Sequence, residues 1–236
     1  MRTGVRRAAF GVAVWAVVVV AAPSSADPLL LTIQPIQVCD DAGGACVNPG
    51  RTLFGSLTRA IWQQAGLWFT ALDWLVVPSS ALLETTVGRL AGASPSVPGV
   101  INVWFVDEIL GCGSGPVYGC GFVGGSGIAV AGRTVTEHRA DVLAHELGHN
   151  LGLDHVLDPA NLMAAGEARL IPAGLPQIYP LGLLSRLESS QIEVALASPH
   201  LTPIPEPGTL ALVLAGGAAL AACRRTPRRG GRGVEP

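Results

Sequence analysis

The chain has 236 residues, of which 49% are hydrophobic, and its 15 basic residues are all arginine. The absence of lysine excludes Schiff-base and lysine-nucleophile chemistry. Residues 27–204 hold seven of these arginines against 15 acidic residues, a formal charge of −8 that the whole-chain value of −2 hides, so nucleic acid and anionic membranes are not expected as partners.

The first 26 residues indicate a signal peptide for export. Arginines at positions 2, 6 and 7 precede an apolar run from Ala8 to Ala22, and the small residues Ser24-Ser25-Ala26 offer a cleavage site. We therefore expect signal peptidase to cut after Ala26. An exported chain then folds in a compartment where disulfides persist.

The remaining part, residues 27–204, has the size of one domain and alternates strand and helix patterns. In chain order the expected elements are a strand at Leu29–Val38, a helix at Thr52–Ala65, a strand within Leu67–Val77, a weakly patterned helix at Ser80–Leu90, a buried strand at Val100–Val106, a short edge strand at Ile128–Ala131, a helix at Val135–Asn150 and a closing helix at Ser185–Ala197. Pro35 marks an edge or a bulge in the first strand. Residues 111–127 contain eight glycines in 17 positions, which predicts a loop.

Four cysteines form two close pairs in this domain, Cys39 with Cys46 and Cys112 with Cys120. In an exported chain this spacing favours two short-loop disulfides, 39–46 and 112–120, although the sequence permits three connectivities. A zinc site built from the four cysteines is disfavoured, because the usual two-residue spacing between metal ligands is missing.

The most informative segment is HELGHNLGLDH, from His145 to His155. It follows a helix start marked by Thr134 and Glu137, which stand in the relation of a capping box. His145 and His149 are one helical turn apart, so both imidazoles can reach one metal ion. The sequence therefore predicts a metal-binding face on this helix.

Two further residues of the segment complete the expected site. Glu146 is offset from the histidines, so it misses the metal but can reach a water molecule bound there. Gly152 suits a sharp turn with positive φ that brings His155 round as the third ligand. Three protein ligands leave the fourth position open, which distinguishes a catalytic zinc site from a structural one.

This segment matches the HExxHxxGxxH signature, and in it the chain resembles the metzincin metallopeptidases. The resemblance implies an α/β zincin fold, in which a twisted mixed sheet carries an active-site helix, a backing helix and a C-terminal helix. It also implies one catalytic Zn²⁺ ion, a protein or peptide substrate, and a methionine turn under the metal, for which Met163 is the candidate. Met163 is followed by Ala164-Ala165, so the tyrosine that some metzincins place there is missing. We expect residues 171–179 to wall the substrate pocket.

The expected function is an exported zinc endopeptidase. Zinc would lower the pKa of its bound water towards 7 and polarise the scissile carbonyl, while Glu146 takes the proton of the water and passes it to the leaving amine. Asp154 either orients a histidine ligand or is simply solvated, and the sequence favours neither. No propeptide of the usual length fits between Ala26 and the first strand, so the sequence does not indicate how the enzyme would be kept latent.

Residues 205–236 form a tail of three parts: Pro205-Glu206-Pro207, an apolar stretch at 208–223 and a cluster of five arginines. The tail resembles a PEP-CTERM sorting signal. This resemblance implies that 208–223 is held transiently in the inner membrane of a Gram-negative bacterium, that an exosortase-like enzyme removes it, and that the protein ends at the cell surface or outside the cell. The tail also motivates the rival hypothesis, a non-catalytic zinc-binding surface or extracellular-matrix protein.

Overall fold

The computed structural model describes residues 28–47, 51–113 and 117–204. The predicted signal peptide and the predicted sorting tail lie outside the described residues. In the described part, no helix combines the length and the apolar character needed to cross a membrane. In chain order the elements are β1 (Leu29–Cys39), α1 (Arg51–Gln63), β2 (Leu67–Ala71), β3 (Leu75–Pro78), α2 (Ser80–Leu83), β4 (Glu84–Thr85), α3 (Val87–Ala91), β5 (Ile101–Val106), β6 (Glu108–Ile109), β7 (Gly119–Gly121), β8 (Gly127–Ala131), α4 (Arg133–Thr136), α5 (Val142–Asn150), the 3₁₀ turns η1 (Gly166–Ala168) and η2 (Leu175–Gln177), α6 (Ser189–Leu196) and β9 (Leu201–Pro203).

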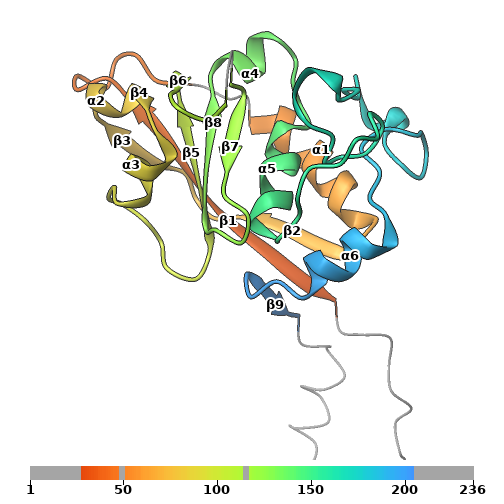
Figure 1. Ribbon diagram of the computed structural model, residues 1–236. Coiled ribbons are helices and arrows are strands. Elements are labelled where there is room, and N and C mark those ends of the chain that lie inside the picture. Colours follow the sequence, from red (N-terminus) through yellow and green to blue (C-terminus); the bar gives the residue numbers. More distant parts are fainter. Residues whose placement is uncertain (1–27, 48–50, 114–116, 205–236) are drawn as a thin grey trace, which may run out of the picture.

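A mixed sheet with strand order β2-β1-β5-β8-β7 forms the centre of the domain (Figure 1). β1 pairs in parallel with β5 on one edge, and on the other edge with β2 up to Ile33 and with β3 from Ile36. Pro35 lies between the last two pairings, so neither of them needs the N–H that proline lacks. β7 and β9 run antiparallel to their partners β8 and β1. The mixed α/β class expected from the sequence is confirmed.

Helices cover both faces of the sheet, and Figure 1 shows α1, α5 and α6 on one side and α2 and α3 on the other. The larger core cluster joins apolar residues of α1 and α5 to the sheet, among them Leu57, Ile61, Leu143 and Leu147. The smaller cluster packs α3 against β5 and β8. Burial of this apolar surface is the main term that stabilises such a layered domain. It fixes α5, the helix with the histidines, on the sheet.

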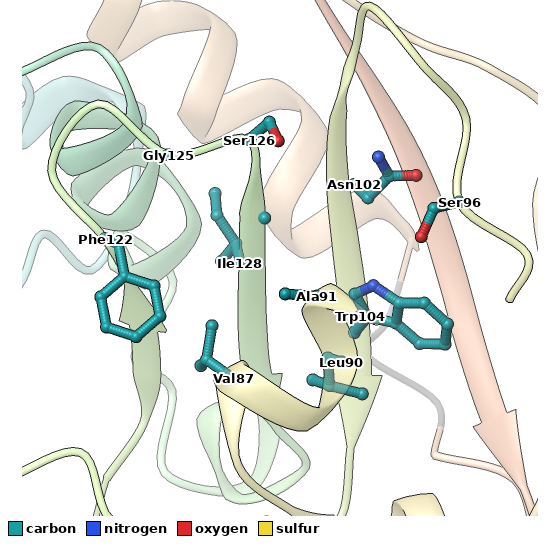
Figure 2. Close-up of a pocket in the computed structure, with 11 residues that line it drawn as sticks. Val87, Leu90, Ala91, Ser96, Asn102, Trp104, Phe122, Gly125, Ser126 and Ile128 are labelled. Carbon is teal, nitrogen blue, oxygen red and sulfur yellow. The ribbon is translucent and has the colours of Figure 1, made fainter. Parts of the chain in front are cut away.

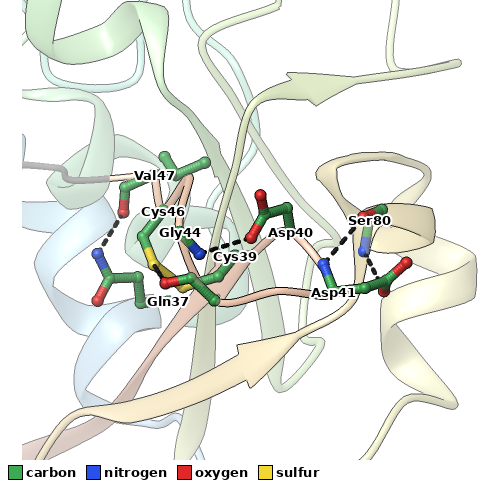
Figure 3. The surroundings of a disulfide bond; sticks show 9 residues. Gln37, Cys39, Asp40, Asp41, Gly44, Cys46, Val47 and Ser80 are labelled. Atoms are coloured by element: carbon green, nitrogen blue, oxygen red, sulfur yellow. Dashed lines mark hydrogen bonds between the residues drawn. A yellow bond between two sulfur atoms is a disulfide. The ribbon is translucent and has the colours of Figure 1, made fainter.

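A disulfide joins Cys39 at the end of β1 to Cys46 (Figure 3). In the loop that it closes, the carboxylate of Asp40 accepts a hydrogen bond of 2.7 Å from the N–H of Gly44. Next to it, Asp41 and Ser80 exchange two hydrogen bonds of 3.0 and 2.9 Å between backbone N–H groups and side-chain oxygens. The loop after β1 is therefore tied both to itself and to the start of α2.

The structure corrects several of the expected elements. The segment 80–90 is not one helix but α2 and α3, separated by β4. The glycine-rich segment 111–127 is not all loop, since it contains β7, and β7 rather than β8 is the edge strand of the sheet. The closing helix is shorter than expected and begins at Ser189, because the preceding Ser185 has a positive φ of 53° that a helix does not allow.

Candidate metal and catalytic site

The helix that carries the first two histidines is α5, and its nine residues are all buried. The expected start of this helix near Val135, with a Thr134–Glu137 capping box, is wrong. The hydroxyl of Thr134 donates to the carbonyl oxygen of Tyr118 at 2.8 Å, and His138 has a positive φ of 53° that ends α4. The pattern of apolar residues continues across this break, which is why the sequence suggested one helix.

The three predicted metal ligands meet at one point. His145 and His149 come from α5, and Gly152, with a φ of 97°, turns the chain so that His155 faces them, as the sequence predicted. The Nε2 atom of His155 lies 3.1 Å from that of His149 and 3.3 Å from that of His145. One ligand atom from each residue lies within 4.8 Å of the others, a spacing that fits a shared ion.

Backbone carbonyl groups orient two of these imidazoles. His145 Nδ1 lies 2.7 Å from the oxygen of Leu162, and His149 Nδ1 lies 2.8 Å from the oxygen of Leu153. When each Nδ1 donates its proton to the carbonyl, the lone pair of the ring is on Nε2, which faces the centre of the triad. Nitrogen lone pairs that converge in this way suit a cation between them, so the residues fit a zinc ion.

The surroundings of the histidines favour the neutral form that binds metals. Burial lowers the pKa of His145 well below its usual value, and the charge of Arg169 acts in the same direction. Burial also lowers the pKa of His149 and of His155. The imidazoles are therefore neutral at neutral pH, with their lone pairs available.

Met163 lies directly under the metal-binding helix and is completely buried. Gly148, the glycine of the HELGH segment, faces the methionine so closely that an added Cβ would overlap its sulfur atom. A hydrogen bond stabilises the turn that contains Met163: the backbone N–H of Met163 donates to Asn161 Oδ1 at 2.8 Å. The glycine therefore lets the helix rest on the methionine.

Glu146 is buried beside the triad, against the glycines of β7. A Cβ on Gly119 would lie 2.7 Å from Glu146 Oε1, so only glycine fits at this point of the strand. Burial raises the pKa of Glu146 to about 8, while the charge of Arg169 and a hydrogen bond from the N–H of Gly121 act in the opposite direction. The side chain of Glu146 is thus held next to the histidines by the two glycines of β7, which present no side chain to it.

Arg169 is a site residue that the sequence analysis missed. Its Nε donates to Asp141 Oδ2 at 2.8 Å, and the side chains of both residues are almost fully buried. Its Nη1 donates to the oxygen of Ala164 at 3.2 Å. Nη1 also lies 2.7 Å from His145 Nδ1, but this contact is not a hydrogen bond when Nδ1 carries the proton that it donates to Leu162. Arg169 therefore links the residue before α5 to the segment after Met163. An Asp one turn before the first histidine was the only sequence signal for this ion pair.

These residues open onto one cleft with a volume of about 460 Å³. It is lined by the triad, Glu146, Arg169, Gly166, Val142 and Arg139 on one side and by residues 112–113 and 117–121 on the other. Residues 171–179, expected to wall the substrate pocket, are not among the described residues that line this cleft, where the segment after Met163 contributes Gly166 and Arg169. The second predicted disulfide pair, Cys112 and Cys120, is bonded at the rim.

Asp154, for which the sequence left two roles open, is exposed to solvent. Its charge acts to raise the pKa of both His149 and His155. In the described part of the chain it forms no hydrogen bond to a histidine. This geometry favours the solvated role over that of a ligand-orienting acceptor.

A second cavity, of about 240 Å³, lies on the α3 side of the sheet (Figure 2). Its lining is mostly apolar, with Leu90, Trp104 and Phe122, and contains no residue that titrates near neutral pH. The polar Asn102 is occupied, because its amide exchanges hydrogen bonds of 2.8 and 3.0 Å with the backbone of Val97. The cavity therefore offers no group for catalysis, and the candidate site is the cleft with the triad.

Residues 91–165 match the family described as Peptidase M66. No curated protein matches the chain in sequence. Among solved structures, the chain is similar to archaemetzincin from Methanopyrus kandleri (13% identity, 71% of this chain and 94% of that one, TM-score 0.48). It is also similar to metalloproteinase-II from Bacteroides fragilis (15% identity, 74% and 54% covered, TM-score 0.44) and to archaemetzincin from Archaeoglobus fulgidus (15% identity, 58% and 87% covered, TM-score 0.36).

The chain spans about half the length of the Bacteroides fragilis protein that it matches. The family match covers less than half of this chain, but it contains all three histidines, Glu146 and Met163. The match and the geometry thus point to the same residues. In the segment that carries its three-histidine cluster, the chain is similar to zinc metallopeptidases.

Proposed function

We propose that this protein is a zinc-dependent endopeptidase of the metzincin type. The observation that carries the proposal is the convergence of three histidine Nε2 atoms beside a buried glutamate in one open cleft. Three imidazoles are a ligand set typical of catalytic zinc, which keeps a further position for water or substrate. Met163, packed under α5, supports the assignment to metzincins.

The roles of the residues follow from their positions. His145, His149 and His155 hold the ion. A bound zinc would supply a Lewis acid that lowers the pKa of water and polarises the carbonyl of the substrate. The charge of a bound zinc ion would lower the raised pKa of the buried Glu146 and favour its ionised form. The Glu146 carboxylate, next to the triad, would then accept the proton of the attacking water and pass it to the leaving amine.

The proposal extends to the two ends of the chain. Residues 1–26 would direct export and be removed by signal peptidase. Residues 205–236 would hold the protein in the inner membrane of a Gram-negative bacterium until an exosortase-like enzyme cuts the tail, which leaves the enzyme at the surface or outside the cell. Its partner there is a protein or peptide substrate. The signal-like composition of both ends supports this part of the proposal.

The test is Glu146→Ala, compared with Glu193→Ala on the exposed surface of α6. We expect both variants to keep the wild-type circular dichroism and zinc content. Only Glu146→Ala should lose cleavage of casein and of a peptide library, by at least about 100-fold, because removal of a general base costs about this much. Equal cleavage by the two variants would refute the mechanism. Bound zinc without cleavage by the wild-type protein would favour the non-catalytic surface or matrix protein.

A further inference from the structure

The cleft contains a second arginine, Arg139, whose charge has no acidic partner. It lies just before α5 and lines the cleft together with Val142 and Glu146. None of the ion pairs in the described part of the chain includes it. Arg169, the other arginine of the cleft, is different, because its charge is paired with the buried Asp141. Of the two arginines that line the cleft, Arg139 is therefore the one whose positive charge is not paired with an acidic side chain in the described part of the chain.

The side chain of Arg139 is held in place from one side. Its Cζ lies 4.3 Å from the centre of the Tyr118 ring, which is a cation–π contact. The carboxylate of Glu137 accepts a hydrogen bond of 2.5 Å from the hydroxyl of Tyr118 and forms no ion pair with Arg139 in the described part of the chain. Tyr118 thus contacts both the guanidinium of Arg139 and the carboxylate of Glu137. A cation that is ordered before binding loses little entropy when a ligand arrives.

One donor of Arg139 lacks an acceptor. Its Nε is buried and forms no hydrogen bond in the described part of the chain. A buried donor without an acceptor is costly, and a planar guanidinium is suited to two parallel hydrogen bonds with a carboxylate. Among the described residues that line the cleft, Glu146 is the only acid, and it stands beside the histidines. Arg139 is partly exposed in this cleft, so an acceptor on a ligand would meet the part of the guanidinium that faces the cleft and not the buried Nε.

We propose that Arg139 binds a carboxylate of the substrate in this cleft, so that the cleft selects acidic peptides. The proposal rests on the proposed function, because it names the substrate class of the same cleft. The charge of −8 over residues 27–204 opposes acidic ligands in general, so the preference has to come from the local charge of Arg139. The carboxylate can come from a Glu or Asp side chain or from the C-terminus of a peptide.

The experiment uses the purified protein and pairs of peptides that differ only by Glu or Gln at each of several positions around the cleaved bond. All have an amidated C-terminus, and a parallel set has a free C-terminal carboxylate. For the wild-type protein we expect one position at which the Glu peptide has a higher kcat/KM than its Gln partner. The difference should be roughly 10- to 100-fold, because a hydrogen bond to a charged group contributes about this much to binding. A preference only for the free C-terminus would assign the carboxylate to that source. Equal cleavage within all Glu/Gln pairs, together with equal cleavage of the amidated and free C-terminal sets, would overturn the proposal.

The variant Arg139→Gln should bring the Glu-to-Gln ratio close to one, and Arg139→Lys should keep part of it, because the charge remains. The matched control is Arg133→Gln, outside the cleft, where Arg133 is 3.5 Å from Glu108. It should keep the wild-type ratio. A ratio that Arg139→Gln leaves unchanged would overturn the assignment to this residue.

A binding measurement separates this proposal from the proposed function. Calorimetry with the Glu146→Gln protein should give tighter binding of the preferred Glu peptide than of its Gln partner, and the added change Arg139→Gln should remove the difference. Tighter binding with no cleavage by the wild-type protein would refute the peptidase and leave the carboxylate site in place. Cleavage without any preference, in rates or in binding, would leave the peptidase and refute the carboxylate site.

Discussion

The two walls of the cleft differ in how their polar groups are satisfied. In the motif wall, residues 141–169, two histidines contact carbonyl oxygens and Arg169 is paired with Asp141. In the glycine wall, residues 117–121, the strand presents backbone and no side chains to Glu146, while Arg139 stacks on Tyr118 without an acid. The first arrangement fixes the positions of catalytic groups, and the second leaves room and charge for a ligand.

We expect the largest effect on stability from a change that removes the ion pair of the motif wall. Arg169→Met leaves the charge of Asp141 buried without a partner, which should lower the free energy of unfolding by about 3–5 kcal/mol. The double variant Arg169→Met/Asp141→Asn should recover a large part of this loss, because the buried charge is gone. Urea unfolding measures both. If Arg169→Met alone unfolds at the wild-type urea concentration, the ion pair does not hold this wall together.

A smaller effect is expected in the glycine wall. Gly119→Ala places a Cβ 2.6 Å from Val142 Cγ1 and 2.7 Å from Glu146 Oε1, so the carboxylate must move. We expect kcat/KM to fall about 100-fold, the cost of a displacement of about 1 Å at a catalytic group, with zinc content unchanged. The control is Gly127→Ala in β8, where a Cβ meets nothing within 4 Å. Wild-type activity of Gly119→Ala would show that this wall does not position Glu146.

The smallest effect concerns an exposed ion pair at the edge of the motif wall. Arg186 donates to Asp158 Oδ2 at 2.6 and 2.9 Å, and these bonds lower the pKa of Asp158. A carboxyl whose pKa is lowered on folding contributes stability above its unfolded pKa of about 3.9, and loses it as the pH falls through the lowered value. Arg186→Ala should therefore lower Tm slightly at neutral pH, with a difference that shrinks below about pH 4. A difference that grows in acid would contradict this assignment.

The motif wall was largely predictable from the sequence, because its chemistry depends on local spacing. One helical turn separates His145 from His149, and the left-handed Gly152 brings in His155. The core strands β1 and β5 were predictable for a similar reason, as short segments rich in apolar residues that favour strands. In each case the residues that determine the structure are close in the chain.

The remaining features depend on contacts between distant segments. Arg169 reaches Asp141 across 28 positions, and no periodic pattern marks such a pair. The break before α5 depends on a hydrogen bond from Thr134 to Tyr118, in a segment where the apolar pattern continues. The strand β7 was hidden by its glycines, although Gly119 and Gly121 alternate around Cys120 in the period of a strand. Composition predicted a loop, and packing against Glu146 selects a strand.

The most direct test of the account is a zinc titration of the purified protein. After removal of metal with a chelator, cleavage of a peptide substrate should be lost. It should return in proportion to added zinc and reach its maximum at one equivalent per chain, while the His149→Ala variant binds no zinc with comparable affinity and stays inactive. Full cleavage by the metal-free protein, or recovery of cleavage by zinc in the His149→Ala variant, would contradict a catalytic ion held by His145, His149 and His155.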